Sequence, residues 1–226
     1  MTRRLFAAGR GRAADLDDAG DAGLSLVELL VAMFVTSILL AGVATVFTGT
    51  LTGVRKVNVK TATSADARIS MEAMSRTIRV AVEPSGQPSA IAVATDHTLS
   101  FYALLNRTGT AGAQPLATLV EYAWSANCVT EAQTPGRLNS SGVLVWDTGR
   151  TVKCLARTSV APDFAFFVDG VTAVPLIVPA SGLTAMARQT VYSIQATVTV
   201  KDPSNADVSG VPVRDRVTLV NVLNGA

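Results

Sequence analysis

Residues 29–47 have the sequence LLVAMFVTSILLAGVATVF, and this stretch decides what kind of protein the chain is. No residue from Leu29 to Val54 carries a charge. A bilayer core of about 30 Å takes about 20 apolar residues in a helix, so the stretch is long enough to span a membrane. A helix with this sequence is apolar on both faces, which argues against a core helix of a soluble domain. We therefore predict one membrane-spanning helix.

The composition of the whole chain agrees with this prediction. Of its 226 residues 49% are hydrophobic and 16% are charged, against about 25% charged in soluble domains. The uncharged stretch accounts for part of the deficit. A second long apolar run is lacking, which excludes a polytopic membrane protein, and the hydrophobicity excludes a disordered chain. The formal net charge of +2 is too small to indicate a polyanion-binding protein.

The main alternative for the apolar stretch is the hydrophobic region of a secretory signal. Such regions are about 7–15 residues long, shorter than this one. Gly42, Val43 and Ala44 offer a poor small-residue cleavage site. An ordinary secreted domain beginning near Thr45 therefore stays open as a second interpretation.

A polar leader, residues 1–23, precedes the apolar stretch. It contains four arginines and four aspartates: Arg3, Arg4, Arg10, Arg12, Asp15, Asp17, Asp18 and Asp21. Lys and Arg determine membrane orientation far more than acids do, so the arginines favour a cytoplasmic N-terminus. Arg55, Lys56 and Lys60 on the far side of the stretch weaken this preference.

One carboxylate, Glu28, lies at the start of the apolar segment. A charged side chain at the centre of a membrane helix costs about 2.5–3.5 kcal/mol, and less near the end. An acid in the first turn also suits the helix dipole. Glu28 is then either an acid at the membrane interface or the partner of an α-amine created at Leu24 by cleavage after Gly23.

The sequence from Gly23 to Met33, GLSLVELLVAM, resembles the class III leader site of type IV pilins and type II secretion pseudopilins. The resemblance implies that a prepilin peptidase cuts between Gly23 and Leu24 and methylates the new N-terminus of Leu24. It also implies that Glu28, the fifth mature residue, pairs with the terminal amine of a neighbouring subunit during filament assembly. Leu24 replaces the commoner phenylalanine, and acidic rather than basic residues immediately precede Gly23.

The helical pattern continues beyond the apolar stretch. Ala67, Met71, Met74, Ile78 and Val82 recur at spacings of four, three, four and four, which predicts a one-sided stripe packed on a sheet. The sequence from Pro84 to Pro88 ends the helix, which we expect to run over 24–83. The glycines at positions 42, 49 and 53 are expected points of bending or local melting.

After residue 84 the pattern alternates, as in strands. We predict strands over 98–105, 117–124, 143–146, 151–156, 164–168, 171–178, 191–200 and 216–223. The strongest is 191–200, in which Tyr192, Ile194, Ala196, Val198 and Val200 share one face and polar residues share the other. Asp169-Gly170 indicates a hairpin between the strands 164–168 and 171–178.

The expected fold class is therefore α+β: a long N-terminal helix packed on a mainly antiparallel β-sheet domain. We divide the chain into a leader (1–23), a transmembrane or filament-core helix (24–54), an amphipathic helix (55–83) and an extracytoplasmic β-rich domain (84–226). A helix carrying RISMEAMSRTIRVA followed by a two-part sheet domain also resembles the layout of the larger minor pseudopilins of the J type and related minor pilins.

Cys128 and Cys154 lie in the segment expected to be exported. Two cysteines in an oxidising compartment suggest a disulfide, worth about 3 kcal/mol. Two free thiols are the alternative. Zinc is not expected, because two cysteines and one distant histidine give no ligand set of recognised spacing.

No enzyme and no cofactor are expected. His97 is the one histidine, and Thr95-Asp96-His97-Thr98 indicates a solvated turn. Phosphate-binding glycine loops and the hydrolase and zinc-protease motifs are absent from the sequence. Calcium bound by an irregular loop stays open, and a hydrolase would depend on His97.

Nucleic acid is not expected as a partner. From Leu24 onward the chain has 15 basic and 13 acidic residues, again a net charge of +2. Phosphate binding would require several basic side chains aligned on one face. The candidates are Arg137, Arg150, Lys153 and Arg157.

The sequence thus predicts a minor pilin or pseudopilin, anchored in the cytoplasmic membrane with its globular domain outside, whose partners are prepilin peptidase and other filament subunits. An extracytoplasmic module that binds DNA or a surface is the alternative. Apolar loops such as 171–178, VTAVPLIV, are candidate subunit interfaces.

Overall fold

The computed structural model describes residues 25–105, 116–169, 174–201 and 209–220. The chain divides into two units, residues 1–52 and 53–226, which are described separately. The first helix, α1, runs from Leu26 to Arg79 and contributes to both. Its hydrogen-bonded pattern is unbroken at the glycines at positions 42, 49 and 53, so the local melting expected there does not occur.

The second unit contains three antiparallel sheets in its described part. The five-stranded sheet has the order β1-β2-β3-β4-β7, the three-stranded sheet β10-β9-β8, and the small sheet β5-β6. The strands of the first sheet are β1 (Ile91–Ala94), β2 (Leu99–Ala103), β3 (Thr118–Ser125), β4 (Cys128–Thr134) and β7 (Thr151–Arg157). The others are β8 (Asp163–Phe167), β9 (Ser193–Val200), β10 (Val211–Thr218), β5 (Arg137–Leu138) and β6 (Leu144–Val145).

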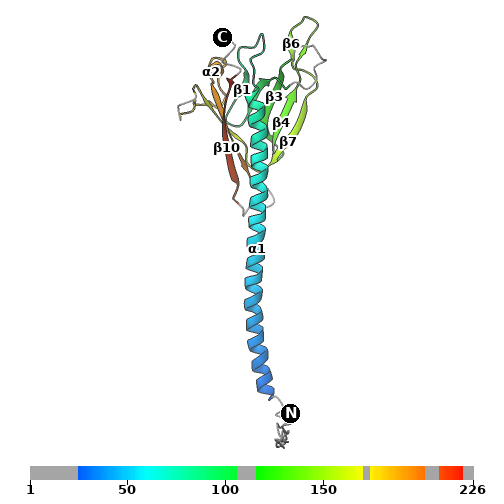
Figure 1. The fold of residues 1–226 in the computed structure, drawn as a ribbon, viewed down its shortest axis with the longest axis vertical. Coiled ribbons are helices and arrows are strands. Elements are labelled where there is room, and N and C mark those ends of the chain that lie inside the picture. Colours follow the sequence, from blue (N-terminus) through cyan, green and yellow to red (C-terminus); the bar gives the residue numbers. More distant parts are fainter. Residues whose placement is uncertain (1–24, 106–115, 170–173, 202–208, 221–226) are drawn as a thin grey trace, which may run out of the picture. The chain divides into compact units, whose positions relative to one another are not determined.

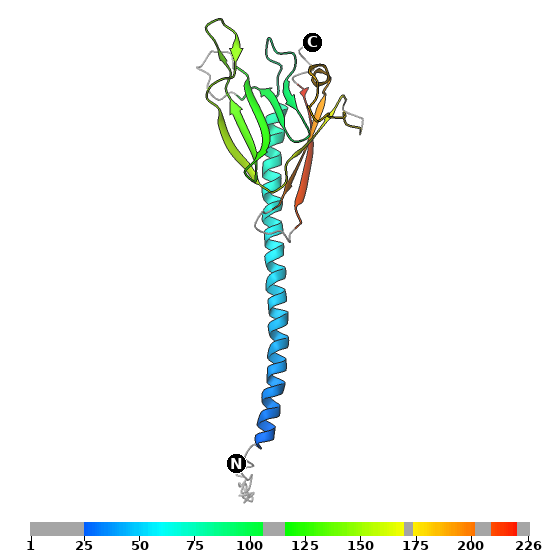
Figure 2. The ribbon, with the colours of Figure 1, turned by 180° about the vertical axis from the view of Figure 1, so that it is seen from behind.

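The C-terminal part of α1 packs on these sheets through the predicted stripe. Ala67, Met71, Met74 and Ile78 are at most 3% exposed, and they share one hydrophobic core with strands of both larger sheets. Figures 1 and 2 show the two sheets on either side of this part of the helix. Burying each of the larger side chains, Met71, Met74 and Ile78, contributes about 1.5–3 kcal/mol. The α+β class and the helix-on-sheet packing are therefore confirmed.

The helix ends earlier than the sequence indicates. It stops at Arg79, four residues before Glu83. Ala81 instead forms an isolated bridge with Ala103, and the backbone N–H of Val82 donates to the Tyr102 carbonyl oxygen at 2.8 Å. Pairing with β2 thus competes with continuation of the helix, and Pro84 cannot extend it.

Most predicted strands are present, with differences at the C-terminal end. The alternation in β9 is as expected from Ile194 onward, where Ile194, Ala196, Val198 and Val200 are buried, but Ser193, expected on the polar face, is fully buried as well. The prediction for 171–178 is wrong where it can be compared, because residues 174–178 form no strand. The final strand begins at Val211 rather than Arg216 and ends at Thr218, and residues 221–223 of the predicted range lie outside the described residues. Gly170, of the expected hairpin, lies outside the described residues.

The predicted ranges do not include β1, β4, β5 and α2. β4 is an interior strand of the five-stranded sheet, between β3 and β7. The helix α2 (Ala185–Gln189) is a single turn, and the side chain of Thr184 caps it by accepting from the backbone N–H of Ala187.

Candidate membrane-anchoring and processing site

Ser25 caps the N-terminus of α1. Its hydroxyl oxygen accepts from the backbone N–H of Glu28 at 3.2 Å, and its carbonyl oxygen accepts from the same N–H at 2.9 Å and from that of Leu29 at 3.1 Å. Helix termini leave their first N–H groups without intrahelical partners, so this serine stabilises the start of the helix. Gly23 and Leu24, the expected cleavage and methylation positions, lie outside the described residues.

The carboxylate of Glu28 is exposed in the first turn of α1. Within residues 25–52 no hydrogen bond or ion pair engages it. An acidic side chain near the positive end of the helix dipole stabilises the start of the helix. Glu28 is therefore available to a partner from outside the described part of the chain.

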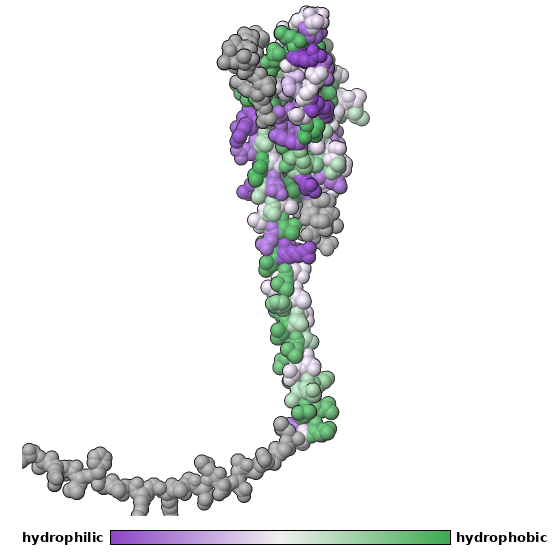
Figure 3. Space-filling model, turned by 90° about the vertical axis from the view of Figure 1, so that its right-hand side faces the viewer, coloured by the Kyte–Doolittle hydropathy of each residue, from purple (hydrophilic) through white to green (hydrophobic). Residues whose placement is uncertain are grey.

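The residues that follow Glu28 present an apolar surface. Every large apolar side chain from Leu26 to Val54 is 49–79% exposed. In Figure 3 the visible face of this part of α1 is mostly green, with pale residues between the green ones. Covering each large apolar side chain would contribute about 1.5–3 kcal/mol. This segment is long and apolar enough to cross a membrane. None of its 18 most apolar consecutive residues is buried within the structure.

The hydroxyl groups in this segment are satisfied by the helix itself. Each donates to a carbonyl oxygen four residues earlier at 2.7–2.9 Å. The residues are Thr36, Ser37, Thr45, Thr48, Thr50 and Thr52. Polar groups without partners are costly in lipid, so this internal bonding makes the segment compatible with a bilayer or a dry protein interface.

A family model described as the prokaryotic N-terminal methylation motif matches residues 19–44. The match contains Gly23, Leu24, Glu28 and most of the apolar surface. The chain carries a type IV pilin-like N-terminus. Together with the apolar helix, the motif supports a membrane-anchored pilin-like subunit and implies processing by a prepilin peptidase and assembly with other pilins. No curated protein matches the chain.

Cys128 and Cys154 form a disulfide that joins the neighbouring strands β4 and β7. It closes the chain over a sequence separation of 26 residues. The bond agrees with an oxidising compartment for the sheet domain.

His97 lies in an exposed turn. Its Nδ1 lies 2.9 Å from the carbonyl oxygen of Pro162 and 3.2 Å from Oδ1 of Asp163. Its side chain is 61% exposed. Among the described residues, no group of three or more His, Cys, Asp or Glu side chains is placed to hold a metal ion.

Three of the four basic residues considered for phosphate binding have acidic partners. Arg137 Nε lies 2.7 Å from an oxygen of Asp147, Arg150 lies 3.0 Å from Glu121, and Lys153 lies 2.9 Å from Glu131. The hydrogen bond from Arg137 lowers the pKa of Asp147 below its usual value of 3.8. This neutralisation leaves Arg157 alone in the set without a described carboxylate partner, and it argues against a nucleic-acid surface here.

Proposed function

We propose that this protein is a minor pilin or pseudopilin, a structural subunit of a type IV pilus or a type II secretion-like filament. Cleavage between Gly23 and Leu24 releases the leader, and the amine of Leu24 is methylated. Before assembly, the apolar segment of α1 anchors the subunit in the cytoplasmic membrane with its N-terminus in the cytoplasm and the sheet domain outside. The helix-and-sheet layout supports a subunit related to the J-type minor pseudopilins.

The observation that carries this proposal is the methylation motif at the start of a helix whose apolar side chains are exposed on every side. A surface of this kind is stabilised by lipid before assembly and by neighbouring helices afterwards. Replacing lipid contacts by protein contacts changes the burial of apolar surface little. The position that the subunit takes in the filament therefore depends on groups other than these apolar side chains. Glu28 is the charged group available for that choice.

Glu28 is proposed to set the register of the subunit in the filament. A buried carboxylate strongly favours the one position at which a cation meets it. The amine of a neighbouring subunit's first residue is such a cation. In other registers the carboxylate faces only apolar side chains.

The N-terminal sequence and intact mass of the protein from membranes of its native host test the processing step. We expect a chain beginning at Leu24 with one methyl group. A chain beginning at Met1 would leave a plain membrane anchor. A start near Thr45 would indicate an ordinary secreted domain, and either result would contradict the proposal.

The variant Glu28→Ala tests the register. We expect normal cleavage and membrane retention, but at least about tenfold less incorporation into filaments, the factor that corresponds to about 1.4 kcal/mol. Glu83→Ala is a matched control, since Glu83 is another exposed acid without a described partner. Normal incorporation of Glu28→Ala would refute the role of the carboxylate.

A further inference from the structure

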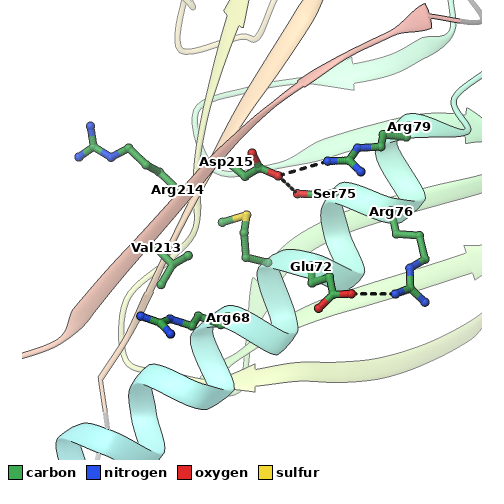
Figure 4. A pocket seen from close by; sticks show the side chains of 9 residues that line it. Arg68, Glu72, Ser75, Arg76, Arg79, Val213, Arg214 and Asp215 are labelled. Atoms are coloured by element: carbon green, nitrogen blue, oxygen red, sulfur yellow. Dashed lines mark hydrogen bonds and ion pairs between the residues drawn. The ribbon is translucent and has the colours of Figure 1, made fainter.

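A groove lies between residues 68–79 of α1 and residues 213–215 of β10, within the second unit. Its volume is about 410 Å³, inside the roughly 300–1,000 Å³ range of ligand pockets. Figure 4 shows side chains from both elements converging on it. Because β10 is the edge strand of its sheet, this side of the domain is not covered by another described strand.

The inner wall of the groove is fixed by Ser75 and Asp215. The hydroxyl of Ser75, a residue that is 4% exposed, donates to Oδ2 of Asp215 at 2.6 Å. Arg79 approaches the same oxygen only to 3.9 Å. The carboxylate of Asp215 is thus committed mainly to holding β10 against α1, and Arg79 is only weakly neutralised.

The lining carries more positive than negative charge. Four arginines and two carboxylates surround the groove, which gives a formal charge of +2. Glu72 pairs with Arg76 at 2.8 Å. No described carboxylate pairs with Arg68 or Arg214. Figure 4 shows Arg68 extending from α1 toward β10, whereas Arg214 extends from the side of β10 opposite Asp215.

The floor of the groove is apolar. Met71 is 3% exposed, and the partly buried Val213 packs against the hydrophobic core. An apolar floor below a basic rim suits a polypeptide that offers carboxylates next to an apolar side chain. Arg favours such partners because its guanidinium donates to both oxygens of a carboxylate.

We propose that this groove is a docking site for an acidic segment of another protein subunit, whose carboxylates pair with Arg68 and Arg79. The inference extends the proposed function, because a filament subunit needs side-to-side contacts with its neighbours. The unneutralised charge of the lining selects acidic over basic partners. The volume admits a few side chains, so a short segment rather than a whole surface enters the groove.

Binding of a fluorescein-labelled oligo-glutamate peptide to the full-length protein in nonionic detergent micelles tests the proposal. We expect binding that weakens as salt rises, and no binding of an oligo-glutamine peptide. Arg68→Glu should weaken binding at least about tenfold, since it reverses the charge that has no partner. Arg68 is exposed, so the thermal midpoint should not change.

Arg157→Glu is the matched control. Arg157 is also exposed and has no described carboxylate partner, but it lies on β7 of the other sheet. An equal loss of affinity in both variants would overturn the proposal, because it would show a general charge effect. Tighter binding of a single-stranded oligonucleotide, or full competition by millimolar inorganic phosphate, would also overturn it in favour of a nucleic-acid or small-anion site.

The outcome can be separated from that of the proposed function. Processing is measured by the start of the mature chain, which Arg68→Glu should leave at Leu24. A protein that is not processed but binds the peptide through Arg68 would contradict the pilin pathway and support the groove. A protein that is processed but does not bind the peptide would support the pilin pathway and contradict the groove.

Discussion

Replacement of Lys153 by methionine should destabilise the sheet domain, because it leaves a buried carboxylate without its cation. Tyr122, Glu131 and Lys153 lie directly opposite one another on β3, β4 and β7. Glu131 is 1% exposed, and its oxygens lie 3.1 Å from the Tyr122 hydroxyl and 2.9 Å from Lys153 Nζ. The side-chain amide of Gln133 donates to it as well.

The magnitude follows from the burial of the pair. Breaking a fully buried ion pair by removing one partner costs about 3–5 kcal/mol. The Lys153 side chain is 51% exposed, so water screens the pair, and we expect about 2 kcal/mol for Lys153→Met. Methionine keeps most of the aliphatic stem, so little packing is lost. The double variant Glu131→Gln, Lys153→Met has no charge in the place of Glu131. Its loss in free energy of unfolding should therefore not exceed that of Glu131→Gln alone.

Urea unfolding of the full chain in micelles, followed by tryptophan fluorescence, measures these energies. Trp124 and Trp146 both lie in the second unit, so the signal reports on the sheet domain. Lys60→Met removes an exposed lysine without a described carboxylate partner and should change stability by less than about 0.5 kcal/mol. A Lys153→Met protein as stable as this control, or a double variant whose cost is the sum of the single ones, would refute the reasoning.

Two further predictions concern the same domain. Replacing Cys128 and Cys154 by serine should cost about 3.5 kcal/mol by the loop-closure relation for the 26-residue separation, and an unchanged urea midpoint would contradict this. Two of the side chains with shifted pKa values, Asp147 and Tyr122, should make stability depend on pH at both extremes. The lowered pKa of Asp147 contributes stability that is present above about pH 3.8 and lost on acidification, so Arg137→Gln should bring the pKa of Asp147 back toward 3.8 in an NMR titration. Burial, followed by the nearby Glu131 carboxylate, raises the pKa of Tyr122, so stability should fall above about pH 10, which Tyr122→Phe should prevent.

The elements that could be predicted from the sequence are those whose apolar side chains recur at a regular spacing. The stripe from Ala67 to Ile78 and the alternation in β9 both follow from burial on one side. In β4 the alternation fails, because Glu131, Gln133 and Thr134 are buried along with Val129. Burial of these polar groups is tolerated because they form hydrogen bonds with neighbouring strands and within β4 itself. The sequence of a single segment does not reveal such partners.

Proline explains two other differences. Residues 174–178 are apolar, but Pro175 and Pro179 lack the N–H groups that a strand needs, and only the N–H of Leu176 donates to β8. In β10, Pro212 is tolerated because this strand lies at a sheet edge. The groove was not predictable at all, since Ser75 and Asp215 are 140 residues apart and neither has a local signal.

The two parts of α1 depend on different sources of stability, and this difference bears on the proposed function. Residues 63–78 bury one face against the sheets of their own domain, so the chain itself stabilises them. Residues 26–54 expose apolar side chains on every side, and only lipid or other proteins can cover them. Among the described residues, the core of the domain contains none of these side chains, so we expect a change of their surroundings from lipid to protein to leave the folding of the domain unaffected. A subunit that leaves a bilayer to enter a filament requires this independence.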